Sequence, residues 1–149
     1  MKDRAGTSMP GDECLTILSI SPFEEDHARL EAIIGKVSKL VTAQSFSAAK
    51  RFLESQNVFL VICERDSLPA TWIECLDYIH SLPTPPFLIV TSRLADERLW
   101  AEVLNLGGWD VLAKPFDARE VLRTVRSTME RYRYSGEVIA KPLSLTAAG

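Results

Sequence analysis

Four apolar runs of the sequence end in side chains that could do chemistry. These are Glu64 and Asp66 after VFLVIC, Thr91 at the end of FLIVT, Lys114 and Pro115 after WDVLA, and Ser21 and Pro22 after LTILSI. A carboxylate that directly follows a buried strand can be a reactive group or a fixed internal charge. The first question is therefore whether Glu64 or Asp66, if either, reacts.

Apolar runs of strand length alternate with segments of helical periodicity along the chain. The predicted strands are 15–20, 40–43, 58–63, 87–91 and 109–113, and the predicted helices are 24–39, 45–56, 70–81, 94–108 and 117–133. Ser45 and Asp117 are the predicted N-caps of two helices, and the Gly107–Gly108 pair suits a C-cap. Uniformly apolar strands that alternate with helices indicate a parallel sheet covered on both faces. The functional crevice of such a sheet lies at the carboxyl ends of its strands, so the four groups of side chains are expected to meet there.

Three acidic residues follow Pro22 in the first turn of the first predicted helix: Glu24, Glu25 and Asp26. Acidic side chains stabilise this end of a helix because it carries the positive end of the helix dipole. We interpret them as capping and solvent-facing charges. The alternative is that one of them reaches into the crevice.

The composition is that of a single soluble domain. The chain has 149 residues, 46% of them apolar and 25% charged, with a formal net charge of −3. Without a basic surplus we expect no nucleic-acid partner. No apolar run approaches the roughly 20 residues that span a membrane, and the N-terminus does not resemble a signal peptide, so we expect a cytoplasmic protein without membrane contact. We assign residues 1–13 and 134–149 to flexible tails and 14–133 to the folded domain.

The cysteines are Cys14, Cys63 and Cys75, an odd number without a CxxC pair. This spacing argues against a disulfide framework and against a zinc site. Cys63 and Cys75 stand in apolar surroundings and are most simply small core residues.

Thr91, the KPF sequence of residues 114–116 and the Gly-Gly turn before the last strand resemble those of response-regulator receiver domains, the CheY-like modules of bacterial two-component signalling. The resemblance covers roughly residues 14–133. It implies a flavodoxin-like (βα)5 three-layer sandwich with a five-stranded parallel sheet of order 2-1-3-4-5. In the family the third strand delivers a phosphoacceptor Asp, the fourth supplies Thr or Ser, and the fifth supplies Lys before a cis proline. Thr91, Lys114 and Pro115 are the equivalents here, with Pro115 expected in a cis peptide bond.

The sequence departs from this family at its acidic positions. The acceptor position holds Glu64 instead of Asp, and Ser21 and Pro22 stand where the family carries the two acids that bind Mg²⁺ with the acceptor. The longer glutamate is expected to reach Lys114 and to mimic part of the modified state. We therefore predict no ordinary metal-dependent phosphorylation and no cofactor, with Mg²⁺ only if a nearby acid rescues the pocket. Asp66 is the alternative acceptor if the third strand extends or slips.

The family's output switch uses an aromatic residue on the fifth strand, where this chain has Val111. Trp109 is expected to share a strand face with Val111 and to act in its place, with core packing as the alternative. Leu99 and Trp100 on the fourth helix are candidate contact residues wherever they are exposed.

The predicted function is that of a stand-alone, atypical receiver domain that acts by protein–protein interaction and is not an enzyme. The expected partner is a histidine kinase, a phosphotransfer protein or another regulator. A homodimer through the face formed by the fourth helix, fifth strand and fifth helix is a further expectation. One alternative is a conventional receiver phosphorylated on Asp66 by a histidine kinase. The other is a small flavodoxin-like enzyme or cofactor binder.

Overall fold

The computed structural model describes residues 15–66 and 71–140, with side chains through Tyr134. The predicted tail at residues 1–13 and Cys14 lie outside the described residues. Strands and helices alternate along the chain: β1 (Thr16–Ile20), α2 (Glu24–Ile34), β2 (Lys39–Ala43), α3 (Phe46–Ser55), β3 (Val58–Glu64), α4 (Trp72–His80), β4 (Phe87–Ser92), α5 (Glu97–Asn105), β5 (Asp110–Ala113) and α6 (Ala118–Ala140).

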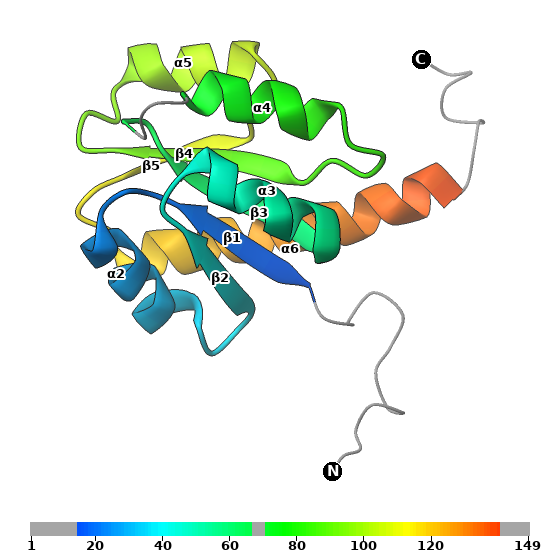
Figure 1. The fold of residues 1–149 in the computed structure, drawn as a ribbon, viewed down its shortest axis with the longest axis horizontal. Coiled ribbons are helices and arrows are strands. Elements are labelled where there is room, and N and C mark those ends of the chain that lie inside the picture. Colours follow the sequence, from blue (N-terminus) through cyan, green and yellow to red (C-terminus); the bar gives the residue numbers. More distant parts are fainter. Residues whose placement is uncertain (1–14, 67–70, 141–149) are drawn as a thin grey trace.

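The strands form one parallel sheet in the order β2-β1-β3-β4-β5, which confirms the predicted fold class. Helices α2 and α6 cover one face of the sheet, and α3, α4 and α5 cover the other (Figure 1). Every residue of the central strand β3 is buried. A strand covered on both faces needs an unbroken apolar run, which is why VFLVIC does not alternate with polar residues.

Most helix starts follow the sequence signals, but the helix predicted over 94–108 is shorter at both ends, as α5 (Glu97–Asn105), and the ends of α2 and α6 also differ from prediction. The side chains of Ser45 and Asp117 accept hydrogen bonds from N–H groups in the first turns of α3 and α6, as N-caps do. Helix α2 ends at Ile34, before Gly35, instead of continuing to residue 39. Helix α6 continues to Ala140, through part of the segment that the sequence analysis assigned to the tail, and its end projects past the sheet (Figure 1).

Gly107 turns the chain from α5 towards β5 with a φ of 104°, a left-handed conformation that glycine adopts without steric cost. A Cβ at this position would lie 2.7 Å from Cε1 of His80. We therefore expect Gly107→Ala to lower the free energy of unfolding by about 1–3 kcal/mol in urea titrations. In a His80→Ala background the added Cβ no longer meets the imidazole. The decrease in unfolding free energy should then shrink to the cost of placing alanine at a positive φ. An unchanged free energy of unfolding in Gly107→Ala would contradict the left-handed conformation of this turn.

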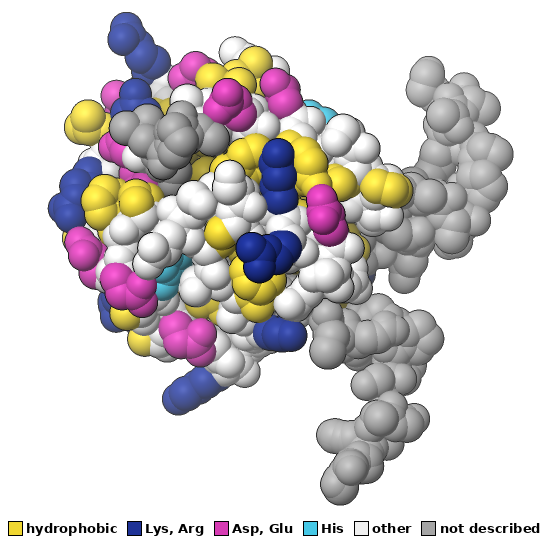
Figure 2. Space-filling view, in the orientation of Figure 1, with side chains coloured by type: hydrophobic (Ala, Val, Ile, Leu, Met, Phe, Trp, Pro, Cys, Tyr) yellow, Lys and Arg dark blue, Asp and Glu magenta, His cyan; other side chains and the backbone are white. Residues whose placement is uncertain are grey.

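Figure 2 shows acidic and basic side chains interspersed over one face of the molecule, with hydrophobic side chains between them. In the described part of the chain, no helix combines the length and the apolar character that crossing a membrane requires.

Candidate functional site at the carboxyl edge of the sheet

The carboxyl ends of four strands bring the predicted side chains together. Glu64 is the last residue of β3 and lies opposite Thr91 of β4 in the parallel register. Ser21 follows β1 directly, and Lys114 follows β5. The Lys114–Pro115 peptide bond is cis, as the resemblance implies. A hollow of about 270 Å³ at this edge is lined by Asp26, Lys114 and Pro115, and Glu64 lies buried beside Lys114.

Both carboxylate oxygens of Glu64 have partners. Oε1 lies 2.6 Å from the Nζ of Lys114 and accepts a hydrogen bond from the Thr91 hydroxyl at 3.2 Å. Oε2 accepts a hydrogen bond from the backbone N–H of Asp66 at 3.1 Å. The expected pairing of Glu64 with Lys114 is therefore present. The Asp66 side chain is exposed, two residues beyond the end of β3.

Asp26 is a member of this site that the sequence analysis placed outside it. Its carboxylate lies 2.9 and 3.2 Å from the Nζ of Lys114 and accepts a 2.7 Å hydrogen bond from the Ser21 hydroxyl. Asp26 is only 5% exposed, so its interpretation as a solvent-facing charge is wrong, whereas Glu24 and Glu25 are indeed exposed. The alternative, in which one acid of this turn reaches the crevice, is the arrangement that the structure shows.

Lys114 therefore bridges two buried carboxylates, those of Asp26 and Glu64. Burial alone lowers the pKa of Lys114, but the hydrogen bonds and charges of Glu64 and Asp26 outweigh it and raise the pKa above its ordinary value. The ring of Phe23 covers the ammonium at 4.9 Å. Two carboxylates and one ammonium leave the cluster with one net negative charge when all three are ionised.

The raised pKa of Lys114 determines how the contribution of this cluster to folding stability depends on pH. The folded chain holds the Lys114 proton more tightly than the unfolded chain, so the contribution to stability is complete below the unfolded pKa. It is lost as the pH rises through the higher folded pKa. We expect the difference in unfolding free energy between the unmodified chain and Lys114→Met to stay constant from about pH 7.5 to 9.5. It should shrink above the ordinary lysine value of 10.5. If this difference in unfolding free energy grows as the pH becomes alkaline, the pKa of Lys114 is not raised in the folded chain.

The residues of the crevice do not fit a resident magnesium ion. Mg²⁺ requires oxygen ligands in octahedral geometry, and protein carboxylates usually supply the charged ones. The two carboxylates here both face the Lys114 ammonium, and the Ser21 hydroxyl donates to Asp26. Across residues 15–66 and 71–134, no three His, Cys, Asp or Glu side chains are grouped so that they could hold a metal ion.

His27 fixes the turn that carries Asp26. Its Nε2 lies 2.9 Å from the backbone carbonyl oxygen of Ser21, and its Nδ1 lies 2.9 Å from the Ser19 hydroxyl. Because a carbonyl oxygen can only accept, Nε2 carries a hydrogen. The buried imidazole therefore ties the first turn of α2 to β1 and holds Asp26 beside Lys114 as a positioning residue.

The predicted output residues divide between the two faces of the sheet. Trp100 of α5 is 49% exposed, whereas Leu99 is buried. Val111 packs with the cluster under α3, α4 and α5, but Trp109 packs against Phe87 on the opposite face, with 4.8 Å between ring centroids. The expectation that Trp109 shares a face with Val111 is wrong, and the core-packing alternative holds. Trp109 precedes β5 and directly follows the glycine turn, so strand alternation does not extend to it.

No protein-family model and no curated protein matches this sequence. Solved structures do match. The signal receiver domain of an HD domain-containing protein from Pseudomonas fluorescens Pf-5 is 24% identical with a TM-score of 0.77, over 88% of this chain and 98% of that one. The signal receiver domain of a putative LuxO repressor protein from Vibrio parahaemolyticus is 16% identical with a TM-score of 0.75, over 81% and 94% of the two chains.

A CheY-like response regulator receiver domain protein from Methanospirillum hungatei JF-1 is 14% identical with a TM-score of 0.72, over 83% of this chain and 99% of that one. These similarities extend over nearly the full length of the matched chains. At such identities they establish the fold. This chain has the CheY-like receiver fold of response regulators.

Proposed function

We propose that this chain is a receiver-type signalling domain whose phosphorylation site has become a fixed ion-pair cluster, and that it acts by binding a partner protein. One observation carries the proposal. The carboxylate at the acceptor position, Glu64, is bonded to Lys114 and Thr91, the two side chains that the family uses to hold a phosphoryl group.

Electrostatics argue against phosphoryl transfer to Glu64. Such a transfer requires an in-line approach and neutralisation of the charge on the phosphoryl oxygens. The positive charge of Lys114 is already shared by Asp26 and Glu64, so an incoming phosphoryl group would meet a cluster that is net negative. Both oxygens of Glu64 also have hydrogen-bond or ion-pair partners. Attack would first have to break these contacts in a buried site.

The face formed by α5, β5 and α6 is the surface on which we expect a partner to bind. A hollow of about 230 Å³ lies on it, and the exposed Trp100 lines this hollow together with Val111 and Glu120. An exposed tryptophan beside a depression is the kind of anchor that dominates protein interfaces. A histidine kinase, a phosphotransfer protein, another regulator or a second copy of this chain are the expected partners.

Phosphorylation by a small-molecule donor tests the proposal. The chain is incubated with acetyl phosphate and Mg²⁺ and its intact mass is measured, with a conventional receiver domain treated in parallel as the positive control. We expect the control to gain a phosphoryl group and this chain to remain unmodified. Stoichiometric modification would contradict the proposal. If that modification disappears in Asp66→Asn, the exposed Asp66 is the acceptor and the chain is a conventional receiver.

A further inference from the structure

Three exposed arginines form a row along one side of α6: Arg119, Arg123 and Arg126. They are four and three residues apart, so successive side chains are neighbours on the helix surface, one turn from each other. On the opposite side of the helix, Val121 and Val125 are fully buried in the hydrophobic cluster against the sheet. The arginine row, as we call the three residues, is therefore the solvent face of an amphipathic helix.

The arginine row has no counterion. In the part of the chain that the structure describes, none of its three guanidinium groups makes an ion pair or a hydrogen bond. Like charges one turn apart on a helix repel each other. Arg119 also lies in the first turn of α6, where the positive end of the helix dipole disfavours a cation. The row therefore opposes folding, and no contact within the described chain compensates for it.

The arginine row lines a hollow of about 410 Å³ on the surface of α6, and the half-buried Leu122 lines it as well. This hollow shares no lining residue with the one beside Trp100. A guanidinium group binds a carboxylate through two parallel hydrogen bonds. The row spans about 10 Å along the helix axis, which is also the span of three acids one turn apart on a second helix. The hollow thus offers cations at helical spacing beside an apolar side chain.

We propose that the arginine row binds an acidic helix of a partner protein, which presents three carboxylates one turn apart beside an apolar side chain. This surface goes beyond the proposed function, because it uses neither the Glu64 cluster nor the hollow beside Trp100. The charge of the whole chain favours a short acidic segment over a long polyanion. With a formal net charge of −3 the molecule repels extended nucleic acid and anionic membranes, whereas a partner helix contacts the row alone.

A titration of the ¹⁵N-labelled full chain with a designed peptide tests the proposal. The peptide is alanine-rich and about 20 residues long, so that it is helical, and it carries one leucine and three glutamates at the spacing of the arginine row. Its control peptide has glutamine at the three glutamate positions. We expect the acidic peptide to shift the amide signals of Arg119, Arg123 and Arg126 at low salt. These shifts should vanish in about 1 M NaCl, where charges are screened beyond about 3 Å.

Three results of this titration would overturn the proposal. They are an absence of shifts with the acidic peptide, shifts confined to other parts of the chain, and equal shifts with the glutamine peptide. None of them bears on the acetyl phosphate experiment, so a failure here is distinct from a failure of the proposed function.

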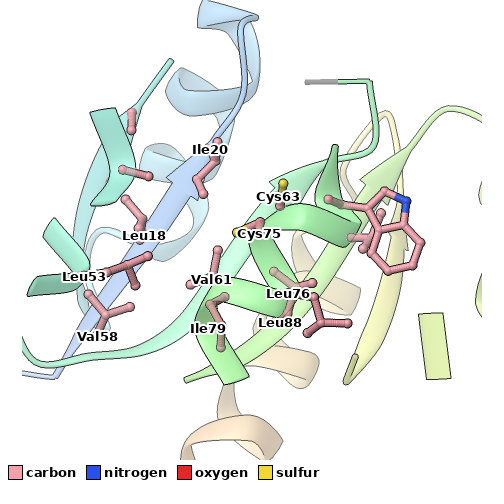
Figure 3. Close-up of a cluster of buried hydrophobic side chains, with 14 of the residues drawn as sticks. Leu18, Ile20, Leu53, Val58, Val61, Cys63, Cys75, Leu76, Ile79 and Leu88 are labelled. Carbon is pink, nitrogen blue, oxygen red and sulfur yellow. The ribbon is translucent and has the colours of Figure 1, made fainter. Parts of the chain in front are cut away.

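Two arginine variants test the position of the binding surface. Arg123→Gln removes one charge of the row, and Arg51→Gln removes the same charge from an exposed position on α3. Helix α3 lies over the hydrophobic cluster on the face of the sheet away from α6 (Figure 3). We expect Arg123→Gln to weaken the affinity for the acidic peptide about two- to fivefold and Arg51→Gln to leave it unchanged. Equal weakening by both would show attraction to the chain as a whole and would overturn the proposal.

The stability of Arg119→Gln separates binding from a role in the fold. Removing this charge relieves both the repulsion from Arg123 and the unfavourable interaction with the helix dipole. We therefore expect a urea midpoint of unfolding that is equal to that of the unmodified chain or higher. A lower midpoint would show that Arg119 has a stabilising partner within the chain and would contradict the proposal.

A polyanion is the competing occupant of the arginine row. A single-stranded oligonucleotide and vesicles that contain phosphatidylserine are titrated in the same way as the peptide. We expect neither to shift the amide signals of the row. If either shifts them more than the acidic peptide does at the same concentration of negative charge, the assignment to a partner helix is wrong.

Discussion

Lys114→Met is expected to lower the free energy of unfolding by about 3–5 kcal/mol at neutral pH. The substitution preserves most of the side-chain volume but removes the ammonium that lies between Asp26 and Glu64. Two buried carboxylates then face one another without a counterion. Breaking a buried ion pair on one side is costly because the remaining charge has lost both water and partner. Urea titration of the variant, followed by circular dichroism, measures the loss.

Lys36→Met is the matched control, since Lys36 is an exposed lysine in the turn after α2. Its effect is expected to remain within about 0.5 kcal/mol, as for most surface substitutions. If Lys114→Met changes the free energy of unfolding as little as this control, the ion pairs of Lys114 do not stabilise the fold as their geometry indicates.

Removing both carboxylate charges from the Lys114→Met variant is expected to restore about 2–3 kcal/mol of its stability. In the triple variant Asp26→Asn, Glu64→Gln, Lys114→Met, each replacement is close in size to the residue that it replaces. The recovery follows because unpaired buried charge, and not lost packing, causes most of the deficit. Double-mutant cycles in urea measure the coupling. Losses that simply add across the three positions would show that the residues act independently.

The parallel sheet was predictable because its central strands have strong signals of their own, and the strand order followed from the family resemblance. VFLVIC and FLIV are uniformly apolar, which is typical of strands in the interior of a parallel sheet. The carboxyl edge then follows from topology, which is why Glu64, Thr91 and Lys114 were expected to meet. Their roles in signalling remain predictions.

The position of Asp26 was harder to predict because an acid in the first turn of a helix can lie in either of two places. It can interact with the helix dipole at the surface, or it can be buried beside a cation. Most such acids interact with the helix dipole at the surface, as Glu24 and Glu25 do. The spacing of Asp26 to Leu30 and Ile33 nevertheless puts it on the buried stripe of α2. An acid on an apolar stripe needs a buried cation, and Lys114 supplies it.

Trp109 was misplaced because strand alternation was counted from a residue that lies before the strand. The glycine turn at residues 107 and 108 resets the direction of the chain, and Trp109 packs with Phe87 under α6. Period-two reasoning holds only inside a strand whose ends are known. The sequence does not show that β5 begins only at Asp110.

Glu64, Lys114 and Asp26 form an ion-pair cluster, and we propose that it takes the place of a metal-dependent phosphorylation site. The most direct test is a titration of the ¹⁵N-labelled chain with beryllofluoride and Mg²⁺, followed by amide NMR spectra. We expect the amide signals of Glu64, Thr91 and Lys114 not to move. Stoichiometric, Mg²⁺-dependent shifts at these residues and at Asp66 would show a working acceptor site and would contradict it.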